Sequence, residues 1–121
     1  MDLKSFLKEN NGFPANRMVQ VSPCFQKDGE EILWEIRAVS EEEYRREAEG
    51  KEDKWAALCV ISVEKPDLKD RTLWESYGVD SAEIVLKEML YPGEYVRLLE
   101  AVKDINGFQK RRKAWKEQAK N

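Results

Sequence analysis

The sequence predicts an α+β fold: a mostly helical single domain with an N-terminal β-hairpin packed on a helical bundle. The length of 121 residues fits one domain. Apolar and polar residues alternate in two segments that flank Asp28-Gly29, a dipeptide typical of hairpin turns. Beyond Ser40, apolar residues recur at helical spacing behind polar capping residues. We expect the domain to span residues 1–107 and a basic helical tail to span residues 108–121.

A short helix is expected at the N-terminus. Asp2 can cap its first turn, and Gly12 lies where it should end. Its apolar residues are spaced i, i+3 and i+4, which places them on one side: Leu3, Phe6 and Leu7.

Two strands should follow and form the hairpin. The first segment, residues 17–22, alternates and is stopped by Pro23, which cannot donate a ladder hydrogen bond. The second, residues 32–39, alternates most clearly, and one of its faces is formed by Ile32, Trp34, Ile36 and Ala38. An isolated two-stranded hairpin is marginal in water, so this face must pack on helices.

The chain beyond Ser40 is expected to be entirely helical. Ser40 and Glu43 predict a capping box, in which each side chain bonds the amide of the other residue. Asp53 can cap the next helix, residues 54–63, which is apolar nearly all round and should be the central buried one. The pattern alone also allows a buried strand here, but the adjacent alanines and the length favour a helix.

Three more helices complete the predicted bundle. The first covers residues 72–77 and ends at Gly78, an expected left-handed cap. Asp80, with Glu83, should open the second, and residues 91–93 should connect it to the third. Leu99 is expected in the core, at the centre of the third helix's apolar stripe, which consists of Tyr95, Leu98, Leu99, Val102 and Ile105.

The composition excludes several kinds of reactive site. Without histidine there can be no Ser-His-Asp triad, Cys-His nucleophile pair or His-ligated metal. Two cysteines, Cys24 and Cys59, cannot form a four-ligand zinc site, and Cys59 is expected as a small buried hydrophobe. The acidic run at residues 41–43 is explained by capping, because successive helical side chains point about 100° apart. We expect no catalytic residue, no metal site and no cofactor.

The chain also lacks the patterns of membrane and exported proteins. The longest apolar run, residues 55–61, is shorter than the ~20 residues needed to span a bilayer. The first residues do not combine a basic start with an apolar core, as a signal peptide would. We therefore expect a cytoplasmic protein without membrane contact.

Charge is distributed unevenly along the chain. Six basic residues and one acid from Phe108 onward give the tail a net charge of +5, against −8 for residues 1–107. A basic tail can contact nucleic acid, an acidic protein or its own domain, and a solvated helix end is the simplest interpretation. Because the acidic body repels phosphate, nucleic acid is the less favoured partner.

Exposed aromatic and basic side chains are the candidates for partner binding, since aromatic residues dominate interfaces when they fill a partner's pocket. Trp34 and Trp55 fall on predicted inner faces and are assigned to the core. The candidates lie near turns or in the tail: Trp74, Tyr77, Tyr91, Trp115, Arg111 and Arg112.

Four spaced blocks resemble one family. They are residues 33–43 (LWEIRAVSEEE), residues 66–70 with 73–79, residues 90–95, and residues 104–108. Together they resemble the XkdN-like tail assembly chaperones of phages, prophages and tailocins. The resemblance implies a non-enzymatic protein of the bacterial host cytoplasm that binds the tape measure protein and recruits tail tube protein. The basic tail departs from the family, since many relatives have an acidic one.

Other functions remain open at this point. The protein could be a structural component of the tail, or a nucleic-acid-associated phage regulator that acts through its basic tail. Self-association is compatible with all of these.

Overall fold

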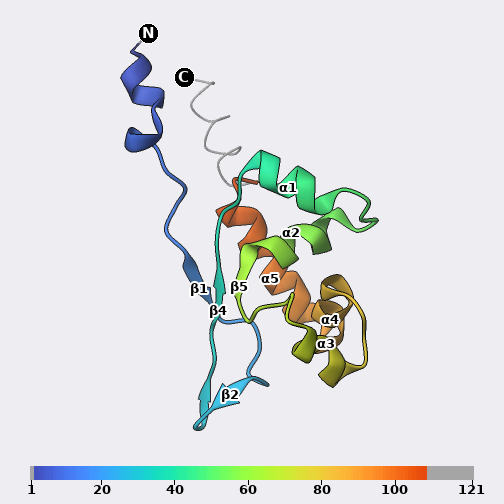
Figure 1. Ribbon diagram of the computed structural model, residues 1–121. Helices are drawn as coiled ribbons and strands as arrows, with labels where there is room; N and C mark the ends of the chain where they lie inside the picture. Colours follow the sequence, from blue (N-terminus) through green and yellow to red (C-terminus); the bar gives the residue numbers. More distant parts are fainter. Residues whose placement is uncertain (1, 109–121) are drawn as a thin grey trace.

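The structure, a computed structural model, describes residues 2–108, in which five α-helices lie on one side of a small antiparallel sheet (Figure 1). The elements are the 3-10 helices η1 (Leu3–Phe6) and η2 (Lys8–Asn10), the strands β1 (Arg17–Val19), β2 (Gln26–Lys27), β3 (Glu30–Glu31), β4 (Trp34–Ile36) and β5 (Val63–Lys65), and the helices α1 (Glu41–Ala48), α2 (Lys54–Ser62), α3 (Arg71–Tyr77), α4 (Ala82–Met89) and α5 (Pro92–Ile105). The predicted α+β class is confirmed. The predicted tail beyond Phe108 lies outside the described residues.

The predicted hairpin is present, with shorter strands. β1 pairs antiparallel with β4, and Val19 lies opposite Trp34. β2 and β3 form a separate tip, whose turn residues have the positive φ of a type I′ turn, 54° at Asp28 and 81° at Gly29. Ile32, expected on the inner face, is 45% exposed because it belongs to this tip, where its amide bonds the Phe25 carbonyl (2.8 Å).

The core lies between the sheet and the helices, with α2 at its centre. The inner face of the hairpin is formed by Trp34 and Ile36, which are 1% and 0% exposed. All seven residues of α2 from Ala56 to Ser62 are buried, and α2 packs against α1, α4, α5 and β5. Burial raises the pKa of Cys59 to about 12, so its thiol stays neutral. The predicted central helix is confirmed.

The expectation that the chain beyond Ser40 is entirely helical is wrong at β5. After the last turn of α2, Val63 lies opposite Ile36, and Lys65 lies opposite Glu35. The Arg37 amide also bonds the Ser62 carbonyl (2.8 Å), which continues the pairing. The second edge of β4 offers unpaired backbone groups, and this long-range pairing outweighs the local helical pattern.

Two helix starts differ from their predictions. Ser81, rather than Asp80, caps α4, because its Oγ accepts a hydrogen bond from the Ile84 amide (3.1 Å). The expected connector at residues 91–93 instead begins α5, since Pro92 occupies the first helical position, where no amide hydrogen is needed. The Glu94 carboxylate completes this start by accepting from the Tyr91 amide (3.0 Å).

Two apolar residues lie differently from expectation. Leu98, which is 0% exposed, is the buried centre of α5, and Leu99 is only half-buried at the edge of the core. Trp55 is 39% exposed because the first turn of α2 extends past the core. Its ring meets Phe108 edge-on at 5.1 Å and has the Lys103 ammonium 4.5 Å from its centre.

The N-terminal segment forms two 3-10 turns instead of the predicted amphipathic helix. Asp2 caps the first turn by accepting from the Lys4 amide (3.0 Å), as expected. Leu3, Phe6 and Leu7 are nevertheless all exposed. Short helices are marginal in water unless an apolar face packs on another surface, and within residues 2–108 these side chains are not part of the core cluster.

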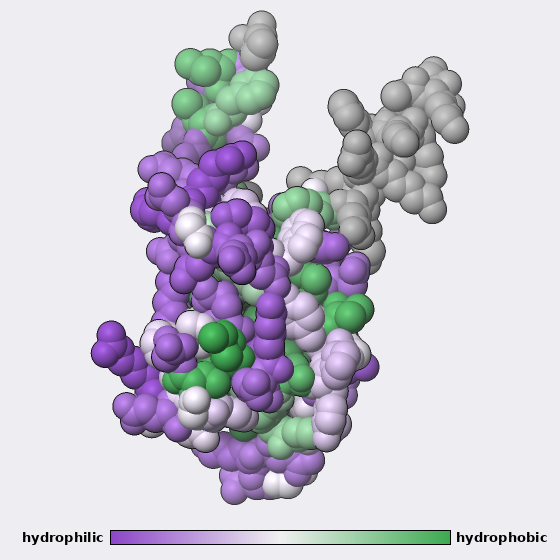
Figure 2. All heavy atoms as spheres, turned by 90° about the vertical axis from the view of Figure 1, so that its right-hand side faces the viewer, coloured by the Kyte–Doolittle hydropathy of each residue, from purple (hydrophilic) through white to green (hydrophobic). Residues whose placement is uncertain are grey.

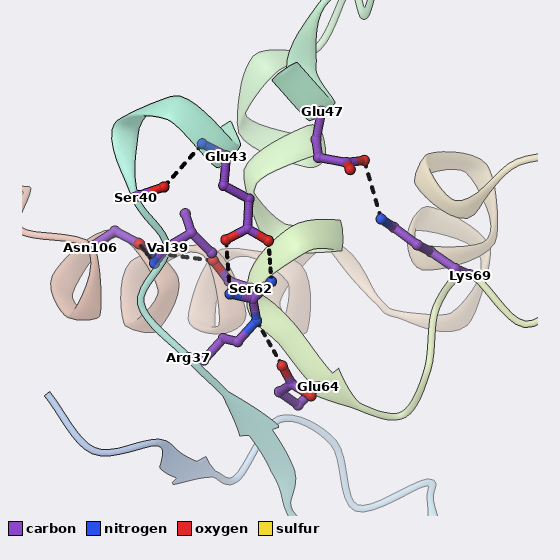
Figure 3. A network of polar contacts seen from close by, with 9 residues as sticks. All are labelled: Arg37, Val39, Ser40, Glu43, Glu47, Ser62, Glu64, Lys69 and Asn106. Atoms are coloured by element: carbon purple, nitrogen blue, oxygen red, sulfur yellow. Dashed lines mark hydrogen bonds and ion pairs between the residues drawn. The ribbon is translucent and has the colours of Figure 1, made fainter. Parts of the chain in front are cut away.

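Arg37 joins the end of β4 to α1 and β5 (Figure 3). Ser40 Oγ accepts from the Glu43 amide (3.1 Å), which is one half of the expected capping box. The Glu43 carboxylate, expected on the Ser40 amide, accepts two hydrogen bonds from Arg37 (3.0 and 2.6 Å), and Arg37 Nε pairs with Glu64 (2.7 Å). The hydrogen bond from Arg37 holds the pKa of Glu43 below its usual value.

Asn106 joins the ends of three elements through its side-chain amide (Figure 3). Its Oδ1 accepts from the Val39 amide (2.9 Å), just before α1 begins. Its Nδ2 donates to Ser62 Oγ (3.0 Å) at the end of α2, and to the Val102 carbonyl (2.9 Å) in α5. The Asn106 side chain therefore connects the end of α5 to the segment before α1 and to the end of α2.

Burial separates the two neighbouring leucines of α5. We expect Leu98→Ala to lower the free energy of unfolding by about 2–5 kcal/mol, through lost transfer energy and the cavity left behind. Leu99→Ala should cost roughly 1–2 kcal/mol, because that side chain is already partly in water. Chemical denaturation of both variants tests this, and an equal loss would place the centre of the core elsewhere.

The Asn106 contacts predict a coupled effect. Asn106→Ala leaves the Val39 amide and the Ser62 hydroxyl without this partner, and should cost about 1–3 kcal/mol. Combined with Ser62→Ala, it should cost less than the two single changes added together, since both remove the same hydrogen bond. Strict additivity in a double-mutant cycle would contradict the assigned contact.

The Arg37–Glu43 pair predicts an acid-dependent loss of stability. Because the folded-state pKa of Glu43 lies below its usual 4.5, the pair stabilises the fold above that pH. This contribution disappears as the pH falls through the lowered folded-state pKa. The difference in unfolding free energy between the wild type and Glu43→Gln should therefore shrink from neutral pH to about pH 3. A difference that stays constant with pH would show that Glu43 does not titrate through this pair.

Candidate functional site

A hollow of about 370 Å³ opens between α1, α2, α3 and α4. Its floor is apolar and consists of Ala57, Val60, Ile61, Trp74 and Ala82. Its rim is charged and consists of Glu47, Lys51, Lys69, Asp80 and Glu83. Figure 2 looks onto this helical side of the molecule, where apolar side chains are visible between charged ones.

Trp74 forms a fixed wall of this hollow. It lies on α3, which begins at the capping residue Asp70 and ends at Gly78, whose φ is 67°. The indole Nε1 donates to the Leu68 carbonyl (2.6 Å), and Leu68 is itself 1% exposed. Because its polar atom is satisfied inside the protein, the half-buried indole ring needs no polar partner in the hollow.

Two ion pairs hold the rim together. Lys51, in the loop after α1, reaches Glu83 on α4 (2.8 Å), and Lys69 reaches Glu47 on α1 (3.2 Å; Figure 3). Exposed pairs of this kind contribute little to stability, typically ~0–1 kcal/mol. Their position at the rim is more important for binding than their energy, because they surround the apolar floor with charges of both signs. Asp80 is the remaining rim charge and lies exposed at the start of the turn before α4.

Of the six candidate partner-binding residues, the structure places Trp74 in the hollow. Tyr77, at the end of α3, is 39% exposed, and Tyr91, at the start of α5, is 69% exposed, but neither lines it. The other three candidates lie outside the described residues: Arg111, Arg112 and Trp115.

Sequence reasoning missed the floor of the hollow. Ala57, Val60 and Ile61 belong to the central helix, which the sequence correctly predicts to be buried. Because that helix is apolar on every side, its pattern contains no signal for the side that its neighbours cover least.

Within residues 2–108 the cysteines and acidic side chains are spread over the fold. No three histidine, cysteine, aspartate or glutamate side chains in this range are grouped so that they could hold a metal ion. Cys24 is exposed and Cys59 is buried, and both are free thiols. No helix in the same range is both long and apolar enough to cross a bilayer.

An apolar floor with a charged rim on a small α+β domain is typical of proteins that bind other proteins. The sequence profile of the phage XkdN-like tail assembly chaperone protein matches residues 3–120. The chain therefore belongs to the XkdN-like phage tail assembly chaperone family, whose members are generally not enzymes and whose partners are phage tail proteins.

The structure is also similar to the crystal structure of the protein YqbN. The TM-score is 0.79, the match covers 90% of this chain and 98% of the YqbN chain, and 24% of the residues are identical. At this identity the likeness shows the shared fold. A comparison with curated proteins finds no match.

Proposed function

We propose that this chaperone binds the tape measure protein during phage tail assembly and helps to recruit tail tube subunits in the bacterial host cytoplasm. Family membership supports a role in tail assembly. The hollow beside Trp74 supports a binding role, because it is an opening on the surface with a half-buried indole as its wall and charged side chains around it.

The floor and rim of the hollow favour one kind of contact. The α2 floor residues, Ala57, Val60 and Ile61, are 3%, 7% and 5% exposed, so a partner reaches them only with an apolar side chain that enters the hollow and packs against Trp74. The rim charges would then pair with charges of opposite sign beside that side chain.

Blocking the hollow should weaken capture of the tape measure protein. Asp80 is exposed at the rim, and Asp80→Tyr would place a ring over the opening without disturbing the core. We expect about tenfold weaker binding to the co-expressed tape measure protein, because the partner must displace this ring. The matched control is Glu88→Tyr, at an exposed position of α4 that does not line the hollow.

Removal of the indole is a second, independent variant. Trp74→Ala should reduce capture as well, with a thermal melt recorded to show that α3 survives loss of the bond to Leu68. Unchanged capture by both Asp80→Tyr and a folded Trp74→Ala would exclude the hollow as the binding site. Weakened capture by Glu88→Tyr to the same degree would show that the effect is not specific to the hollow.

A further inference from the structure

Helix α1 lies against α2 (Figure 1) but covers it with very little apolar surface. Six of the eight residues of α1 are charged, and its one buried residue is Ala48. Helix α4 has the same length but buries Ala82, Val85 and Leu86. The local stability of an element depends on how much apolar surface it buries, so α1 should be held much less firmly than α4.

The contact between α1 and α2 also lies beside the main core. Ala48 on α1 and Ala57 and Ile61 on α2 are buried, but none of the three belongs to the main cluster of buried side chains. Helix α1 reaches that cluster with Tyr44, which is half-buried. The main cluster would therefore lose only the contact of Tyr44 if α1 moved away from α2.

Open space lies on both sides of α1. The hollow beside Trp74 adjoins it on the side of Glu47. A second hollow, of about 840 Å³, adjoins it on the side of Arg45 and shares no lining residue with the first. Arg45 and Glu47 are two residues apart and therefore point to opposite sides of the helix. Helix α1 thus rests on a strip of α2 and is not enclosed by other elements.

Polar contacts hold α1 in place. Arg37, at the end of β4, bonds Glu43, and Lys69, before α3, pairs with Glu47 (Figure 3). A third contact joins Lys51, in the loop after α1, to α4. Ion pairs that are partly exposed to water are screened by salt and contribute little to stability. These contacts therefore fix the position of α1 without adding much to its stability.

The chain is anchored on both sides of α1. Before the helix, the Val39 amide donates to Asn106 (2.9 Å). After it, Asp53 caps α2 and pairs with Lys87 (2.7 Å). Residues 40–52 can therefore leave the body and return while the chain on either side stays in place.

We propose that α1 is a lid, which detaches from α2 and opens the floor of the hollow beside Trp74 to the partner. In the closed form the floor admits a side chain at most, since Ala57 and Ile61 are 3% and 5% exposed. Detachment uncovers both side chains and widens the hollow on the side of Glu47. The identity of the partner rests on the proposed function, whereas the movement of the lid can be measured on the chain alone.

Hydrogen exchange of the full-length chain measures this movement. A helix of eight residues is marginal in water once it is detached, so its amides exchange whenever the lid is open. We expect the hydrogen-bonded amides of α1 to be at least about tenfold less protected than those of α4, the matched control of equal length. Equal protection of the two helices would show that α1 opens only when the whole domain unfolds, and the proposal would be overturned.

Two variants at one exposed position test whether the lid controls binding. The Arg46 side chain is 64% exposed on α1 and does not line the hollow beside Trp74. Arg46→Gly and Arg46→Ala both remove its charge but differ in helix propensity, so α1 should be about fivefold less protected in the glycine variant. The glycine variant should also capture the co-expressed tape measure protein about fivefold more tightly, because its open state is more populated.

The outcomes distinguish the lid from the proposed function. A difference in protection between the two variants without a difference in capture would show that α1 does not control this site, and the proposal would be overturned while the proposed function stands. A wild-type chain that does not capture the tape measure protein would contradict the proposed function. The protection of α1 relative to α4 would then still decide whether α1 moves as a lid.

Discussion

Helix α2 has no polar face, and this constraint determines where the other elements lie. A helix that is apolar all round must be covered on every side, and here the cover comes from α1, α4, α5 and β5. The hairpin then closes the core through Trp34 and Ile36. Where α1, α3 and α4 meet over α2, the cover is incomplete, and the resulting hollow is floored by the central helix itself. The candidate binding surface is therefore a gap in the cover of the core.

Features of the fold that depend on local chemistry could be predicted from the sequence. Asp28-Gly29 forms the expected turn, Asp53 caps α2 through the Ala56 amide, and Gly78 adopts the left-handed conformation. Features that depend on distant partners could not. β5 exists only because β4 offers an open edge, and the choice between Leu98 and Leu99 as the buried residue follows from how α5 rests on α2.

The candidate binding surface was less predictable, because it too depends on residues that are distant in the sequence. Trp74 could be chosen as an aromatic residue on a short helix, but its role as a wall depends on its bond to Leu68 and on neighbours distant in the sequence. The apolar spacing of residues 3–7 was visible, yet spacing cannot show that Leu3 and Phe6 are exposed among the described residues. A pattern identifies a face and leaves open what packs on it.

The β2–β3 tip offers a practical handle on this protein. It projects from the lower end of the ribbon, opposite the end where the N-terminus lies (Figure 1), and none of its residues lines the hollow. A Cβ placed at Gly29 would meet nothing within 4 Å. A short epitope or a small fluorescent label inserted between Asp28 and Gly29 would extend into solvent, because loop tips tolerate insertions. Tail assembly could then be followed by microscopy or by immunoprecipitation with the candidate hollow left unaltered.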